Sequence, residues 1–166
     1  MPIPAMPVLV APNPPLQVVL VSPRIPQNTG NVARTCAVTG SRLHLVGPIL
    51  FSLEDERLRR AGLDYWRSLS PEMHAGWSEF EAAAVRGQIQ KLHLFSGKAP
   101  RSVFSEPFAP GDLLVFGSEQ DGLPPALLDA YPDRCVGIPM LAGARSLNLA
   151  TSVGIGLYEA LRSVSR

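Results

Sequence analysis

The chain has 166 residues, of which 46% are hydrophobic and 17% are charged. This composition excludes a disordered protein, and the length fits one globular domain. Because 15 lysines and arginines are balanced by 14 aspartates and glutamates, charge alone does not indicate a nucleic-acid-binding protein.

The first 16 residues are rich in proline, and we expect a flexible leader (1–16) ahead of the main domain (17–166). The leader has no positive n-region and prolines break its apolar part, so it is a poor secretory signal. Cys36 and Cys135 are far apart, which fits a reducing compartment, and no Cys/His spacing predicts a metal site. No apolar run reaches the roughly 20 residues that span a bilayer. We therefore expect a cytoplasmic protein that does not enter a membrane and holds no metal.

Five strand-like runs alternate with segments that carry helix start and stop signals. The runs are QVVLV (17–21), RLHLV (42–46), KLHLF (91–95), DLLVFG (112–117) and RCVGI (134–138). This alternation predicts an α/β fold with a mainly parallel sheet.

The predicted helices have recognisable ends. Three of them begin at a capping residue and end at a glycine: Asn28 to Gly40, Ser52 to Gly62, and Ser78 to Gly87. The last helix has one apolar stripe, at Leu149, Val153, Leu157, Leu161 and Val164. This stripe predicts one buried face. Gly154 and Gly156 interrupt the helix and indicate close packing.

Three glycine-containing loops follow predicted strands. They are NTGNVAR after the first strand, GSEQDGLP after the fourth and IPMLAGARSLNLA after the fifth. Loops at the carboxyl ends of parallel strands are the usual ligand sites of α/β proteins. None of the three matches GxxxxGK[ST] or GxGxxG, so we do not expect an ordinary nucleotide-binding fold.

The first loop, taken alone, has two interpretations. In one, Asn28 caps the helix, Gly30 permits a tight approach and Arg34 is a solvated helix residue. In the other, Arg34 projects back toward the loop and offers a fixed cation to an oxyanion or phosphate.

The other two loops are equally open. GSEQDGLP is either a turn that leads into a proline-started helix or a site where a ligand meets Gly117 and Glu119. In the third loop, Ser146 and Asn148 can cap the last helix or hold a ligand.

The remaining candidate groups have weaker patterns. RLRRAGLDYW (57–66) is either a solvated helix end or a surface that combines arginine charge with aromatic stacking. The three histidines, His44, His74 and His93, have no metal or triad spacing, so we assign them no role. We interpret Cys36 as a small buried hydrophobic residue.

Taken together and in this order, the three loops resemble the motifs of the SPOUT superfamily of RNA methyltransferases, in its 2′-O-ribose-methylating branch. IPQNTGNVARTCAVTGSRLHLVGP and DERLRRAGLDYW are similar to the small TrmL type of that family, which modifies tRNA nucleotide 34. The resemblance runs from about Gln17 to Arg162.

This resemblance implies a fold, a cofactor and partners. The expected fold has a deep trefoil knot in roughly 92–166, although chains otherwise avoid knots. The expected cofactor is S-adenosylmethionine, the expected substrate is the anticodon stem-loop of tRNA, and the expected assembly is a homodimer. The residues implied to contact S-adenosylmethionine are Phe95, Ser96, Gly117, Glu119, Ile138, Met140, Ser146 and Leu147.

The resemblance also implies catalytic roles for Arg34 and Asn148. The residues implied to contact RNA are Asn28, Arg24, Arg59, Arg60 and Arg145. Because arginine stays protonated in proteins, we expect Arg34 to stabilise the developing alkoxide, with a phosphate oxygen or water taking the proton. Asp121 stands where several relatives carry a basic residue, and Ala150 replaces a common serine.

Two alternative functions stay open. The target can be a different tRNA or rRNA nucleotide, since no appended RNA-binding domain indicates it. The chain can also be a non-catalytic, knotted RNA-binding protein.

Overall fold

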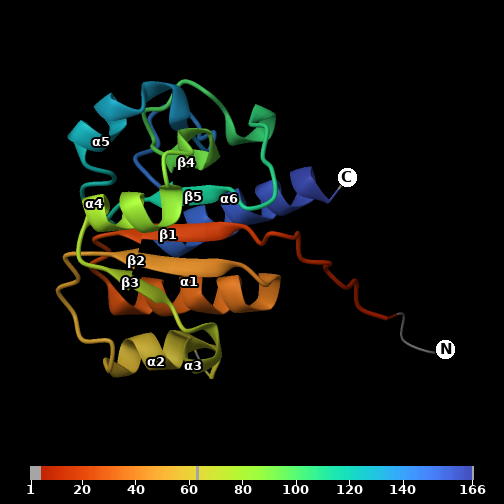
Figure 1. The fold of residues 1–166 in the computed structure, drawn as a ribbon, viewed down its shortest axis with the longest axis vertical. Coiled ribbons are helices and arrows are strands. Elements are labelled where there is room, and N and C mark those ends of the chain that lie inside the picture. Colours follow the sequence, from red (N-terminus) through yellow and green to blue (C-terminus); the bar gives the residue numbers. More distant parts are fainter. Residues whose placement is uncertain (1–4, 63, 166) are drawn as a thin grey trace.

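The computed structural model describes residues 5–62 and 64–165, which form a sheet with helices on both faces (Figure 1). The strands are β1 (Gln17–Val21), β2 (Arg42–Val46), β3 (Glu72–His74), β4 (Leu92–Phe95), β5 (Leu113–Phe116) and β6 (Cys135–Val136). The α-helices are α1 (Pro26–Thr39), α2 (Glu56–Gly62), α3 (Tyr65–Leu69), α4 (Trp77–Phe80), α5 (Pro125–Ala130) and α6 (Leu149–Val164). A π-helical turn, η1 (Glu81–Val85), follows α4, and the 3₁₀ turns are η2 (Ile89–Lys91), η3 (Val103–Ser105) and η4 (Pro132–Arg134).

The strands lie in the order β3-β2-β1-β5-β4-β6, and the five strand pairings found among the described residues are all parallel. The α/β fold with a mainly parallel sheet is therefore confirmed. The five predicted strands are all present, most of them one to three residues shorter than predicted. β3 was missed because three residues give too short an alternation to detect.

Both faces of the sheet are buried, as near-continuous apolar strands require. On one face, Val18, Leu20 and Leu114 belong to a core that includes residues of α1 and α6. On the other face, Val19 and Val115 pack into a core with residues of α4 and α5. No helix in the described part of the chain is long and apolar enough to cross a bilayer.

The order of the strands brings the first two glycine-containing loops together. The chain runs from β1 through α1 to β2 on one side, whereas β5 and β4 lie on the other side of β1. The strand order therefore reverses between β1 and β5. Open parallel sheets bind ligands at such a reversal, beside the carboxyl ends of the strands.

The apolar stripe of α6 is confirmed, since four of its five residues are buried and Val164 packs against the same core. Gly156 lies against the ring of Phe95, and a Cβ added there would stand 2.8 Å from Cε1. This glycine therefore lets α6 approach the end of β4.

The predicted start of the first helix is wrong. α1 begins at Pro26, two residues before Asn28, and its N-cap residue is Ile25. The carboxylate of Glu119, from the loop after β5, accepts hydrogen bonds from the backbone N–H groups of Arg24 (2.8 Å) and Ile25 (3.0 Å). A distant side chain thus supplies acceptors at a helix start that usually uses a local cap. The helix ends at Gly40, as predicted.

The two predicted capping boxes are also wrong at their starts. Ser52 Oγ accepts a hydrogen bond from the N–H of Glu54 in a turn, and α2 begins only after Asp55, whose carboxylate accepts from the N–H of Arg57. α4 begins at Trp77, before Ser78. The predicted ends agree better, because α2 ends at Gly62 and η1 ends at a left-handed turn formed by Arg86 and Gly87.

Candidate active site

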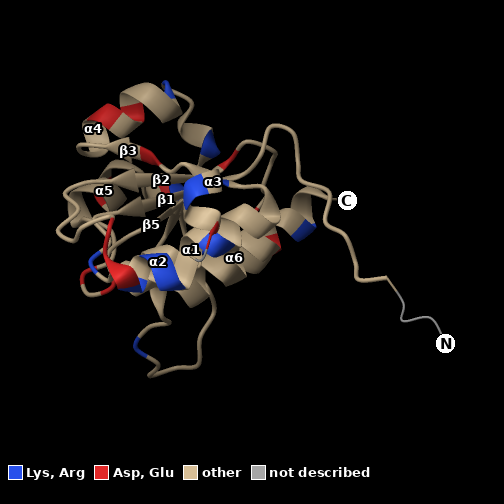
Figure 2. Cartoon of the chain, turned by 90° about the horizontal axis from the view of Figure 1, so that it is seen from below, with Lys and Arg blue, Asp and Glu red and all other residues tan. Residues whose placement is uncertain are grey.

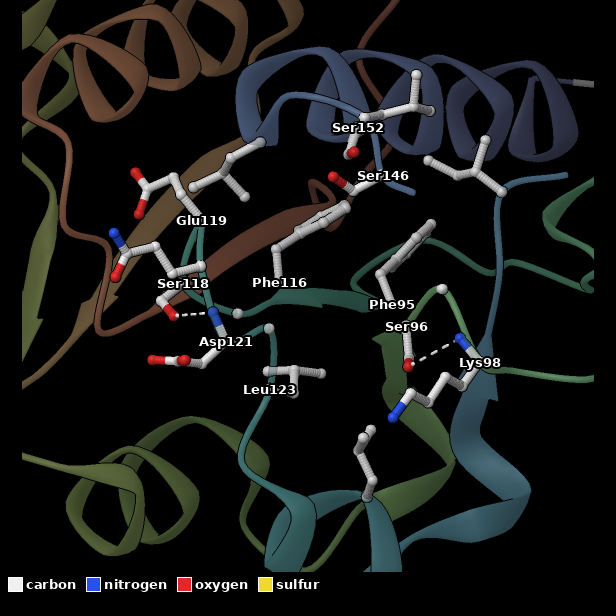
Figure 3. Close-up of a pocket in the computed structure, with 18 of the residues that line it drawn as sticks. Phe95, Ser96, Lys98, Phe116, Ser118, Glu119, Asp121, Leu123, Ser146 and Ser152 are labelled. Atoms are coloured by element: carbon white, nitrogen blue, oxygen red, sulfur yellow. Dashed lines mark hydrogen bonds between the residues drawn. The ribbon is translucent and has the colours of Figure 1, made fainter. Parts of the chain in front are cut away.

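The loops after β4, β5 and β6 and the start of α6 enclose a cavity of about 680 Å³ (Figure 3). The eight residues that the resemblance assigns to the methyl donor all line it: Phe95, Ser96, Gly117, Glu119, Ile138, Met140, Ser146 and Leu147. The fold therefore brings together residues from separate segments of the sequence. The volume lies within the range of small-molecule sites, about 300–1,000 Å³.

Two stacked aromatic rings form one wall of this cavity. Phe95 ends β4 and Phe116 ends β5, and their ring centroids are 4.3 Å apart at an interplanar angle of 20°. Figure 3 shows the two rings side by side, with Ser146 and Ser152 near one end. Flat apolar surface beside a few hydroxyl groups is the usual lining of a cofactor site.

Sequence reasoning missed several lining residues. These are, among others, Lys98, Phe116, Ser118, Leu123 and Ser152. Phe116 and Ser118 flank Gly117, so their position at the carboxyl end of a predicted strand could have indicated them. Ser152 lies in the first turn of α6 and has no comparable signal.

Gly117 makes room for a turn of the chain. The backbones of Ser118 and Gly122 exchange two hydrogen bonds of 3.2 and 3.0 Å, and Ser118 Oγ accepts a third from the N–H of Asp121 (Figure 3). A Cβ on Gly117 would stand 1.9 Å from the carbonyl carbon of Gly122. Only glycine fits here. The segment that packs against Gly117 is the backbone of Gly122, which also lines the cavity.

Glu119 joins the loop after β5 to the start of α1. Besides its two backbone partners, its Oε1 accepts a hydrogen bond of 3.3 Å from Asn28 Nδ2. Asn28 is 8% exposed, so this contact is largely shielded from water. The carboxylate thus holds the start of α1 through three hydrogen bonds and also lines the cavity, and its predicted contact with the cofactor stays a prediction.

Asn148 extends this network to the third loop. Its Nδ2 donates to Asn28 Oδ1 at 3.0 Å, and its Oδ1 accepts from the N–H of Thr151 at 3.1 Å, which caps α6. The chain Glu119–Asn28–Asn148 therefore links the three glycine-containing loops. Since both ends of the Asn148 amide have partners, the geometry favours a positioning role for this residue.

A second cavity, of about 400 Å³, lies between α1 and α2. It is lined by Gln27, Asn31, Arg34, Arg57, Arg60 and Ala61. The two helices pack closely because Gly30 lacks a side chain: a Cβ there would stand 2.4 Å from the carbonyl oxygen of Leu58. Figure 2 shows basic segments (blue) on α1 and α2 on the same side of the molecule. Gly30 thus allows α1 and α2 to pack closely, and this packing brings Arg34, Arg57 and Arg60 to one cavity.

Arg34 is the unneutralised arginine of this cavity. Arg57 pairs with Asp55 at 3.0 Å and Arg60 with Glu56 at 3.5 Å. Arg34 is exposed, and its guanidinium makes no hydrogen bond or ion pair with the residues that the structure describes. Its guanidinium is free to bind an anion bidentately.

The other arginines predicted to contact RNA do not lie in one place. Arg24 pairs with Asp121 at 2.7 Å and donates to Gln120 Oε1 at 2.8 Å, and both of these partners line the cavity of about 680 Å³. Arg145 lines that cavity. Arg59 is exposed on α2 but does not line the cavity that contains Arg34.

The histidines and Cys36 are core residues. His93 lies between two buried carboxylates, with Nδ1 2.8 Å from Glu106 and Nε2 2.7 Å from Asp112. His44 and His74 are hydrogen-bonded to each other. Burial raises the pKa of the Cys36 thiol well above its ordinary value, which argues against a nucleophilic role.

Comparisons with known proteins show the family of the chain. Residues 15–158 match the SpoU rRNA Methylase family. The chain is 45% identical over 146 residues to the tRNA (cytidine(34)-2'-O)-methyltransferase of Burkholderia pseudomallei (strain 1106a), covering 87% of this chain and 93% of the relative.

Solved structures of methyltransferases have a similar fold. A structure reported as giving insights into the 2-OH methylation of C/U34 on tRNA aligns with a TM-score of 0.82 at 43% identity, covering 89% of this chain and 95% of the other. An AdoMet-bound rRNA methyltransferase from Sinorhizobium meliloti aligns with a TM-score of 0.71 at 27% identity, covering 89% of this chain and 56% of that one.

Proposed function

Since the chain belongs to the SpoU rRNA methylase family, we propose that it transfers the methyl group of S-adenosylmethionine to the ribose 2′-hydroxyl of tRNA nucleotide 34. The cavity of about 680 Å³ carries this proposal, because its lining contains all eight residues that the resemblance assigns to the methyl donor. The target position follows the similarity to a tRNA (cytidine(34)-2'-O)-methyltransferase. Such a substrate places the enzyme in the cytoplasm.

The residues of the cavity fit S-adenosylmethionine. Phe95 and Phe116 offer flat apolar surface, and Ser96 and Ser146 offer hydroxyl groups beside it. The bound cofactor supplies a methyl group that its sulfonium already activates. The protein then has to bind and orient the two reactants and to stabilise the charge that develops.

The arginines between α1 and α2 serve the acceptor. Alignment of the 2′-hydroxyl is an entropic problem, and fixed phosphate contacts reduce it. Arg34 stabilises the developing alkoxide while a phosphate oxygen or water takes the proton. Arg57 and Arg60, which line the same cavity, hold neighbouring phosphates. Binding of tRNA should therefore weaken as salt rises.

We further propose that residues 92–166 contain the trefoil knot. The chain leaves the edge strand β6 and returns inward, where α6 packs against β5 and α1. Val103 and Phe108, from the connection between β4 and β5, belong to the same core as α6. The helix α6 therefore packs on the same face of the sheet as the connection between β4 and β5. This arrangement supports a chain that passes through its own loop.

A homodimer is the proposed assembly, and the surface of α6 supports it. Gly154 has no atom within 4 Å of an added Cβ, so a single chain does not explain this glycine. Tyr158, one turn later on the same helix, is 54% exposed. A small residue beside an exposed aromatic side chain suits close packing against a second copy.

Gly154→Leu is expected to convert the dimer to monomers. If a second copy packs here, the added side chain collides with it, and size-exclusion chromatography with light scattering will report the mass of one chain. If the face is free, leucine instead raises helix stability by about 1 kcal/mol. An unchanged dimer mass would contradict the proposed interface.

Product mapping tests the proposed function. The protein is incubated with labelled S-adenosylmethionine and unmodified tRNA, the tRNA is digested, and the methylated nucleoside is located by mass spectrometry. We expect a 2′-O-methylated cytidine or uridine at position 34. Methyl on a base, or outside the anticodon loop, would overturn the assignment. Calorimetry that detects no donor binding would favour a non-catalytic RNA-binding protein.

A further inference from the structure

Three potential metal ligands lie together at one edge of the sheet. His44 is in β2, and Glu72 and His74 are in the edge strand β3. The parallel register places Glu72 opposite His44 and His74 opposite Val46. Both imidazoles contact the ring of Phe80 on α4, at centroid distances of 5.4 and 5.3 Å. The cluster is therefore on the face of the sheet opposite the core that contains α1.

The donor atoms of these side chains are close to a metal-binding arrangement. His44 Nδ1 is 3.0 Å from His74 Nε2 and 3.7 Å from Glu72 Oε2. One ligand atom from each residue lies within 4.8 Å of the other two. In a tetrahedral zinc site with bonds of about 2.0–2.1 Å, ligand atoms are about 3.3 Å apart. Small side-chain movements would make this triangle regular.

Gln17 orients His44 for such a site. Gln17 Nε2 donates to the carbonyl oxygen of Gly111 at 3.1 Å, which leaves Oε1 facing His44 Nε2 at 2.8 Å. His44 Nε2 therefore carries the hydrogen, and the lone pair on Nδ1 points toward His74 and Glu72. A hydrogen bond on the second ring nitrogen is the usual support of a metal-binding histidine.

The cluster is shielded but can be reached from solvent. His44 is 1% exposed and His74 is 8% exposed, whereas the Glu72 side chain is 52% exposed. The glutamate thus reaches from the buried imidazoles to the surface and gives an ion a route to them.

We propose that His44, Glu72 and His74 bind a zinc ion that ties the edge strand β3 to β2. Two imidazoles and one carboxylate suit zinc, whereas magnesium and calcium prefer oxygen ligands alone. The sequence spacing gave no sign of this site, because the ligands are on different strands and meet only through the register. The three side chains leave the fourth position of a tetrahedral zinc to a water molecule. Because the sheet separates the cluster from α1, the ion would stabilise the edge of the sheet and take no part in methyl transfer.

The first test measures zinc on tag-free protein. Calorimetry and elemental analysis after dialysis should find one zinc per chain. At a free zinc concentration about 100 times Kd, the Tm should rise by roughly 5 to 10 °C, and the same concentration of magnesium should leave it unchanged. A Tm that does not respond to zinc, or no retained zinc, would overturn the proposal.

Variants assign the binding to these residues. Glu72→Gln changes a half-exposed side chain and should fold normally, yet it should weaken zinc binding by at least about 10-fold. His74→Gln should abolish binding. Glu54→Gln is the matched control, because it makes the same change at an exposed carboxylate outside the cluster. The Glu72→Gln result stands even if the histidine variant does not fold. If Glu72→Gln binds zinc as tightly as the unchanged protein, the assignment is wrong.

Discussion

Arg34→Lys is expected to lower kcat for methyl transfer to tRNA by roughly 10²- to 10³-fold, the usual effect of losing one donor to a developing oxyanion. Lysine keeps the positive charge, but its ammonium cannot reproduce the planar fork that binds an alkoxide and a phosphate together. Arg57 and Arg60 cannot replace Arg34 at the 2′-hydroxyl, because in the proposed mechanism they hold the neighbouring phosphates. The loss should therefore appear in kcat even at saturating tRNA.

Donor binding separates this effect from misfolding. Arg34 lies outside the cavity assigned to S-adenosylmethionine, so calorimetry should give the same donor Kd for Arg34→Lys as for the unchanged chain. Arg42→Lys is the matched control, because Arg42 is exposed at the amino end of β2, away from the loops that follow the strands. Near-normal turnover by Arg34→Lys with intact folding would reduce Arg34 to a structural residue.

The strands and the clustering of the eight residues around the cavity of about 680 Å³ were predictable because their signals are local or ordered along the chain. After Gln17, the run VVLV (18–21) is apolar throughout, and its four residues are buried in β1, which is what such a run requires. Phe95, Ser96 and Gly117 follow or end predicted strands, and parallel strands bring such ends to one edge of the sheet. The resemblance of the three loops then assigned these neighbouring residues to one ligand.

The contacts between distant segments could not be predicted in the same way. Asn28 has the right chemistry for a helix cap, but the sequence does not show that Glu119 reaches the backbone ahead of it. Gly30 indicated a tight approach, but the sequence does not show that α2 is the segment that makes it. His44 and His74 meet only because β2 and β3 pair in one register. In each case a partner far along the chain determines the role of the residue.

Glu119→Gln distinguishes a cofactor ligand from a residue that positions α1. The amide has one acceptor oxygen, while Glu119 accepts through two oxygens from Arg24, Ile25 and Asn28. At least one N–H group at the start of α1 therefore loses its partner. Such a loss costs about 1–3 kcal/mol, so the free energy of unfolding should fall by that amount.

The same substitution should also lower kcat at saturating S-adenosylmethionine by roughly 10-fold or more. A misplaced Arg34 that raises the activation free energy by about 1.4 kcal/mol already gives that factor. The reason is that α1 carries Arg34, and Glu119 fixes the start of this helix to the wall of the donor cavity. Asp121→Asn is the control in the same turn, because its exposed ion pair with Arg24 should contribute no more than about 1 kcal/mol. A higher KM for the donor, with unchanged stability and kcat, would instead make Glu119 a cofactor ligand. If the free energy of unfolding and kcat fall together, the hydrogen-bonded chain Glu119–Asn28–Asn148 is what positions Arg34 relative to the methyl donor.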